Sequence, residues 1–287
     1  MSDRIEVLKT YKTYIGGKFP RSESERTYEL KGLKGDHIAN VCRCTRKDVR
    51  EAVVASRTAF DSWQSRSAYN RGQIIYRIAE ILEGRKNQFI SELEKAGEKT
   101  KHAVQEVHAS IDRLIYYSGW TDKLSQVFGT VNPVASPHFN FSTPEPCGIV
   151  GIIAPDESPL LSFISLMAPV ITGGNTCVIL ASEKNPLTAI SFSEVLHASD
   201  VPGGVVNILS GFRDELVGPL TSHMDVNGVL NAVNEQNIRK LTDENSSISI
   251  KRVHHYFSDN WVDESHESPY LIHPFLEIKT TWHPVSA

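Results

Sequence analysis

The chain has 287 residues, of which 40% are hydrophobic and 22% charged, a balance typical of a globular protein with at least one buried core. Its formal net charge of -4 argues against the basic surface that binding to nucleic acid requires. The first residues, MSDRIEVLKT, have no apolar targeting core, and no apolar run reaches the roughly 20 residues that span a bilayer. We therefore expect a cytoplasmic protein that does not associate with membranes.

The first 126 residues predict mainly helices. Thr45 stands three residues before Asp48, which is the spacing of a capping box at the start of a helix. Apolar and small residues then recur at three- and four-residue steps, so each helix has one face toward a core. These apolar stripes cover residues 49–63, 74–93 and 104–120.

Two extended regions differ in character from the helices. Residues 130–146 are too rich in proline for a helix, and Phe139 alternates with Phe141, so we predict a hairpin that stands off the body. At the other end of the chain, Leu276, Ile278, Thr280 and Trp282 alternate in the same way, which predicts a final strand.

Strands and helices alternate from residue 147 onward. The runs CGIVGIIAP, TCVIL and VVNIL are short and apolar on both sides, as expected for parallel strands covered on both faces by helices. The sequence therefore predicts an α/β domain with a doubly wound sheet, whose ligands would lie at the carboxyl ends of its strands. Beyond residue 232 the pattern weakens, and residues 233–268 are interpreted as a degenerate polar linker.

Neither the cysteines nor the histidines give a metal-site pattern. Four cysteines are too few for a disulfide framework, and the pair Cys42 and Cys44 offers zinc two of the four ligands that it needs. A metal-binding pair remains the alternative to two reduced thiols. His254, His255 and His266 lie among acidic residues without metal-site spacing, so we predict a solvated polar loop.

Several blocks resemble the coenzyme domain of the aldehyde dehydrogenase superfamily. They include YIGGKF, KDVREAVVASRTAFDSW and YYSGWTDKL in the first half of the chain, and EPCGIVGIIAP, ITGGNTCVIL, SEKNPLTA, EVLHASDVPGGVVNILSG and HMDVNG further on. The resemblance covers most of residues 12–230. The tail YLIHPFLEIKTTWHP is similar to the strand by which these enzymes join the sheet of a neighbouring subunit.

The resemblance implies an aldehyde-dehydrogenase-like fold that has an oligomerisation element but no catalytic domain. The chain also resembles the second module of the two-module branch of the superfamily, which likewise lacks that domain. The resemblance divides the chain into an N-terminal helical part of the coenzyme domain, an oligomerisation hairpin, a doubly wound coenzyme-type core, the linker and an oligomerisation strand, at residues 1–126, 127–146, 147–232, 233–268 and 269–287.

Catalytic groups of the family are missing from the matching positions. No cysteine follows Cys177, which itself lies within the predicted strand TCVIL, where we expect a buried side chain and no reactive thiol. The motif that supplies the oxyanion-binding asparagine of the family reads PDESP here, with Glu157 at the asparagine position. A carboxylate there would repel a developing oxyanion, so we expect no catalytic residues and a pseudoenzyme.

The coenzyme contacts that the resemblance implies are incomplete. Of the lysine-proline-serine-glutamate stretch that holds the adenosine ribose, Ser182 and Glu183 remain, whereas Ala181 takes the place of the lysine and proline. The glycine-serine-threonine turn under the pyrophosphate is replaced by residues 233–235, Val-Asn-Glu, which would crowd and repel a diphosphate. We therefore expect no bound cofactor. If NAD or NADP does bind, Pro155, Ser182 and Glu183 would line the adenosine end.

Three functional interpretations follow from the resemblance. The first is a non-catalytic structural or regulatory subunit that forms a homo-oligomer, or a complex with a full-length aldehyde dehydrogenase, through its tail strand. The alternative is an NAD(P)-binding oxidoreductase subunit that oxidises aldehydes only with a catalytic partner chain. The third is a fragment of a longer enzyme, which the family-like tail disfavours.

Overall fold

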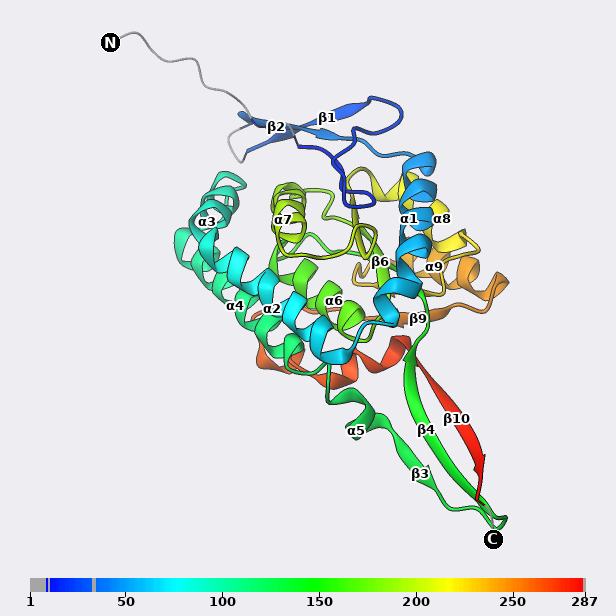
Figure 1. Ribbon diagram of the computed structural model, residues 1–287. Coiled ribbons are helices and arrows are strands. Elements are labelled where there is room, and N and C mark those ends of the chain that lie inside the picture. Colours follow the sequence, from blue (N-terminus) through cyan, green and yellow to red (C-terminus); the bar gives the residue numbers. More distant parts are fainter. Residues whose placement is uncertain (1–8, 10, 33–34, 286–287) are drawn as a thin grey trace.

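A parallel five-stranded sheet forms the centre of the protein in a computed structural model that describes residues 9, 11–32 and 35–285 (Figure 1). Residues 1–8, 10, 33–34 and 286–287 lie outside this description, and with them parts of the predicted segments 1–126 and 269–287. The strand order is β7-β6-β5-β8-β9. The bounds are β5 Ile149–Ile153, β6 Thr176–Leu180, β7 Val206–Leu209, β8 Gly228–Asn231 and β9 Arg252–His255.

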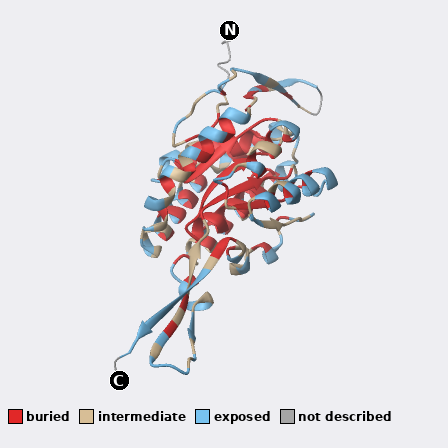
Figure 2. Cartoon of the chain, turned by 90° about the vertical axis from the view of Figure 1, so that its right-hand side faces the viewer, coloured by how far each residue is buried: buried red, intermediate tan, exposed pale blue. Residues whose placement is uncertain are grey.

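Helices cover both faces of this sheet, as predicted for a doubly wound domain (Figures 1 and 2). One face packs against α1 (Arg46–Gln64), α8 (Arg213–Ser222) and α9 (Gln236–Ile248). The opposite face packs against α6 (Leu161–Thr172) and α7 (Leu187–Ala198). An outer layer is formed by α2 Ala68–Gly84, α3 Lys86–Lys95 and α4 Thr100–Ser118, and the short α5 is Leu124–Phe128.

The predicted start of α1 is confirmed. Thr45 caps the helix, and Asp48 completes the capping box by accepting a hydrogen bond from the backbone N–H of Thr45 at 2.7 Å. At the far end of the helix, the indole N–H of Trp63 donates to the carbonyl oxygen of Ile171 at 3.2 Å. The capping box defines the start of α1, and the Trp63 contact joins its end to α6.

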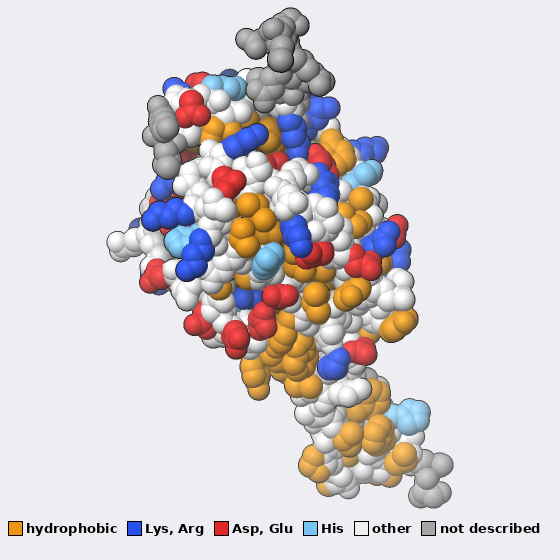
Figure 3. All heavy atoms as spheres, turned by 90° about the vertical axis from the view of Figure 1, so that its left-hand side faces the viewer, with side chains coloured by type: hydrophobic (Ala, Val, Ile, Leu, Met, Phe, Trp, Pro, Cys, Tyr) orange, Lys and Arg blue, Asp and Glu red, His pale blue; other side chains and the backbone are white. Residues whose placement is uncertain are grey.

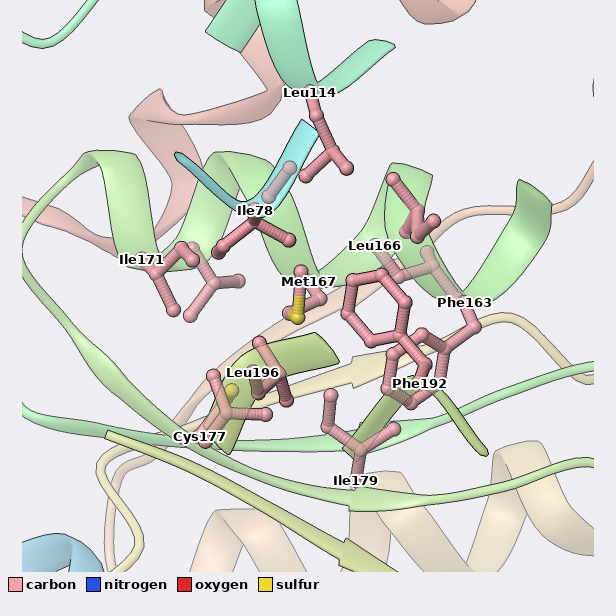
Figure 4. Close-up of a cluster of buried hydrophobic side chains, with 14 of the residues drawn as sticks. Ile78, Leu114, Phe163, Leu166, Met167, Ile171, Cys177, Ile179, Phe192 and Leu196 are labelled. Carbon is pink, nitrogen blue, oxygen red and sulfur yellow. The ribbon is translucent and has the colours of Figure 1, made fainter. Parts of the chain in front are cut away.

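The core beneath α6 and α7 is apolar and closely packed (Figure 4). Phe163 of α6 and Phe192 of α7 meet edge to face with their ring centroids 5.6 Å apart. Cys177 of β6 lies fully buried in this cluster, and burial raises the pKa of its thiol. The prediction that Cys177 is a buried side chain is therefore confirmed.

The segment 233–268 differs from the predicted linker. It contains α9, and strand β9 pairs in parallel with β8, with Val229 opposite Val253. The buried face of α9 consists of Ile238, Thr242 and Ser246, which are mostly polar by type. Because this segment is polar in composition, its sequence did not indicate that α9 and β9 belong to the sheet domain.

The solvated loop predicted around the histidines is also wrong in part. Trp261 and His266 are only 1% and 5% exposed, and their rings stack with centroids 5.0 Å apart. The hydroxyl of Tyr117 on α4 donates to the carbonyl oxygen of His266 at 3.0 Å. Three one-turn 3-10 helices, Glu264–His266, Pro269–Leu271 and His273–Phe275, then lead to the last strand.

An antiparallel three-stranded sheet projects from the body, and we call it the arm (Figure 1). It consists of β3 (Thr130–Asn132), β4 (His138–Pro146) and β10 (Leu276–Pro284), in the order β10-β4-β3. The predicted hairpin and the predicted final strand are therefore neighbours in one sheet. A separate hairpin, β1 (Thr27–Lys31) with β2 (His37–Cys42), lies at the opposite end of the molecule. No helix in the described part of the chain is long and apolar enough to cross a membrane.

Candidate functional site

A network of charged and polar groups lies at the carboxyl ends of β5 and β6, where a parallel sheet places its ligands. Its centre is Asp156, three residues beyond β5. One carboxylate oxygen accepts from the hydroxyl of Ser182 at 2.8 Å and from the backbone N–H groups of Glu183 at 3.0 Å and Lys184 at 3.2 Å. The loop after β6 is therefore wrapped around the carboxylate that follows β5.

Arg213 is a further partner of Asp156 in this network. As the first residue of α8, it directs both terminal guanidinium nitrogens at Asp156, with N–O distances of 2.7 and 2.9 Å. One of them also donates to the carbonyl oxygen of Ala154 at 3.1 Å. The residue is 8% exposed, so this is a bidentate ion pair in a largely dry position.

The surroundings of Asp156 determine its charge. Burial acts to raise the pKa of its carboxyl. The hydrogen bonds and positive charge of Arg213 act to lower it, as do the hydrogen bonds from Ser182 and the Lys184 backbone, and together these outweigh burial. The net result is a pKa below the usual range of an aspartate. Asp156 is therefore ionised at neutral pH.

The structure brings together the residues that were predicted to line an adenosine site. Ser182 is 2% exposed and its hydroxyl donates a hydrogen bond to Asp156. Pro155, which precedes Asp156 in the chain, is buried. Glu183 is half-buried, and its carboxylate accepts from the backbone N–H of Arg213 at 2.8 Å. Glu157, the residue at the predicted asparagine position, is exposed. Each polar group of the predicted pair therefore already has a partner within the protein.

The turn after β8 is closed by the side chain of Asn231. The amide of Asn231 accepts from the backbone N–H of Val233 at 3.0 Å and donates to its carbonyl oxygen at 3.1 Å. Val233 is 5% exposed, and Glu235 immediately precedes α9 with its carboxylate 3.9 Å from Arg213. The turn thus places a branched side chain and a negative charge at the start of α9.

This set of groups does not suit a dinucleotide diphosphate. Asp156 and Glu235 lie near the guanidinium of Arg213, and Glu183 binds the backbone N–H of the same residue, so a diphosphate would bring further negative charge among three carboxylates. The donors that face this position already bind the carboxylate of Asp156. The residues present therefore disagree with the cofactor that the family resemblance implies.

Sequence reasoning did not identify the two central residues of the network. Asp156 stands within the PDESP motif, but its partner Arg213 lies 57 residues further along the chain. The available signal was a pair of opposite charges, each just beyond the carboxyl end of a predicted strand. Charged residues at that edge of a sheet are candidates for pairing.

Comparison with known proteins supports the same family. The model of the aldehyde dehydrogenase family matches residues 19–255. The mitochondrial benzaldehyde dehydrogenase of Antirrhinum majus is 34% identical over 75% of this chain and 41% of its own length. Omega-crystallin of Enteroctopus dofleini is 32% identical over 79% of this chain and 46% of its own length.

The solved structures agree with the sequence comparison. An NAD+ complex of an aldehyde dehydrogenase from Bacillus cereus superposes with a TM-score of 0.83 at 26% identity, covering 87% of this chain and 51% of that one. The chain thus spans about half the length of the relatives that it matches. From the family match, the NAD-binding type of fold and the relatives together, the chain belongs to the aldehyde dehydrogenase family.

Proposed function

We propose that this chain is a non-catalytic aldehyde dehydrogenase homologue that acts as a structural or regulatory subunit and assembles through its arm. The observation that carries the proposal is the arm itself, which leaves the body with β10 as an edge strand. An edge strand offers backbone donors and acceptors to a further strand, which is the basis of β-augmentation.

Apolar side chains on the arm support this role. Figure 3 shows them gathered on the projecting sheet, with few charges between them. On one face of the arm, Ile278 and Trp282 of β10 are 48% and 57% exposed. On the opposite face, Val131 of β3 and Phe139 of β4 are 68% and 46% exposed. Large exposed apolar groups on a protruding sheet are typical of a surface that becomes buried on association.

The sequence of β10 is suited to pairing with a second copy of itself. Antiparallel pairing centred on Thr280 places Ile278 opposite the Trp282 of the second copy. The same register places Glu277 opposite His283, so that acidic and basic types meet. This arrangement is two-fold symmetric and closed, so it favours a homodimer over open-ended assembly.

The assembly state tests this proposal. We expect the protein to be a dimer in analytical ultracentrifugation. Ile278→Lys with Trp282→Lys should weaken the dimer roughly 100-fold, since two exposed apolar groups that association would bury are replaced by charges. The matched control is Met224→Lys with Ile248→Lys, two residues that are 73% and 77% exposed on the body, and this variant should remain dimeric. A wild-type monomer would refute self-association, and a dimer only with an added full-length aldehyde dehydrogenase would identify the partner as that enzyme.

The NAD-binding type of fold motivates a second candidate, an NAD(P)-binding oxidoreductase subunit that depends on a catalytic partner chain. The carboxylates around Arg213 argue against it, so we expect titration calorimetry with NAD and with NADP to show no saturable binding. Saturation by either nucleotide at submillimolar concentration would favour the second candidate instead.

A further inference from the structure

The groups that hold Asp156 form an oxyanion-binding cradle. We define this cradle as the Ser182 hydroxyl, the backbone N–H groups of Glu183 and Lys184, and the guanidinium of Arg213. All five donor contacts are 3.2 Å or shorter. Two backbone N–H groups with a bidentate arginine form the donor arrangement that proteins use for carboxylate and phosphate alike.

Two features of Arg213 do not depend on Asp156. Arg213 is held in place independently, because it also donates to the carbonyl oxygen of Ala154. Its Nε is buried and has no hydrogen-bond partner among the described residues. The guanidinium therefore retains one donor that neither Asp156 nor Ala154 uses.

We propose that Asp156 is the intramolecular occupant of a site for phosphate-type oxyanions, an autoinhibitory contact that excludes an external anion from the carboxyl edge of the sheet. The inference does not depend on assembly through the arm. The groups that form this site are the same ones that oppose a dinucleotide, and the anion that fills it is Asp156, a residue of the chain.

The charges around the cradle determine how tightly it is expected to bind phosphate once Asp156 is removed. Lys184 is largely exposed, with its Nζ 3.8 Å from Asp156, and it supplies a second cation at the solvent side. Glu183 and Glu235 remain as opposing carboxylates when Asp156 is removed. The cradle without Asp156 therefore has a net charge near zero, and its affinity for phosphate comes from hydrogen bonds.

The test removes the occupant and keeps the donors. Asp156→Ala should bind inorganic phosphate in titration calorimetry at least roughly tenfold more tightly than the wild type at constant ionic strength, because the donors then lack a partner. The matched control, Asp156→Ala with Arg213→Met, should lose this gain. Equal affinities in the wild type and the single variant, or a gain that survives in the double variant, would overturn the proposal.

Folding of the variant is addressed by a second substitution. Asp156→Ser leaves space for an external oxyanion and adds a small hydroxyl that can bond to the Arg213 side chain. Phosphate should raise the melting temperature of Asp156→Ser and Asp156→Ala well above the shift that it gives the wild type, as expected for a ligand that binds the folded state. If either variant is unfolded in phosphate-free buffer and stays unfolded in phosphate by circular dichroism, the proposal fails.

Discussion

Replacing Trp261 by alanine is expected to lower the free energy of unfolding by about 3–5 kcal/mol. The indole is 1% exposed and packs against Tyr256, with ring centroids 5.9 Å apart, as well as against the ring of His266. Removing it leaves a cavity beneath the segment that joins β9 to β10. Urea titrations followed by far-ultraviolet circular dichroism measure the change.

The chain offers a matched control for this substitution. Tyr69 on α2 is 69% exposed and lies away from the arm, so Tyr69→Ala should change the unfolding free energy by less than about 1 kcal/mol. Trp261→Phe keeps most of the ring and removes an indole N–H that has no partner among the described residues. It should therefore lower the free energy of unfolding less than Trp261→Ala does. An alanine variant as stable as the wild type would mean that the segment after β9 is not part of the core.

The difference between the predicted linker and this packed segment has a physical origin. Periodicity identifies buried elements only when the buried side chains are apolar by type. The apolar strands β5 and β6 met that condition, and so did α1 with its capping box. The α9 helix buries Thr242 and Ser246, and β9 reads RVHH, so neither carries a strong pattern. Their places are set by pairing with β8 and by packing against α8, which are tertiary contacts.

In the candidate site, too, the sequence does not predict contacts that depend on tertiary structure. Sequence similarity could place Pro155, Ser182 and Glu183 at one edge of the sheet, because the strand order of a doubly wound fold fixes that edge. It could not show that the Asp156 carboxylate turns inward to Arg213, since that contact depends on where α8 begins relative to β5. Spacing along the chain carries no information about such a pair.

The substitution Glu106→Gln is expected to stabilise the protein increasingly as pH rises. Glu106 is 5% exposed on α4, and one carboxyl oxygen accepts from the backbone N–H groups of Leu160 and Leu161 at 2.8 and 3.2 Å. Burial raises the pKa of Glu106 from 4.5 to about 7, although these two hydrogen bonds act to lower it. The folded state therefore binds a proton that the unfolded chain releases at lower pH.

The sign of the pH dependence follows from this difference in proton binding. The stability contributed by protonated Glu106 is present below pH 4.5 and is lost as pH rises through about 7. A glutamine accepts the same backbone hydrogen bonds without ionising, so the variant should gain roughly 3 kcal/mol over the wild type between pH 4.5 and pH 8. Urea titrations of both proteins across this range measure the gain.

A surface glutamate separates this effect from a general change in charge. Glu51 is exposed on α1, and Glu51→Gln removes one negative charge as Glu106→Gln does. Its unfolding free energy should stay within about 0.5 kcal/mol of the wild type at each pH. If the difference between Glu106→Gln and the wild type were the same at pH 5 and pH 8, Glu106 would be ionised throughout that range. The positive end of α6 would then stabilise its charge more strongly than burial opposes it.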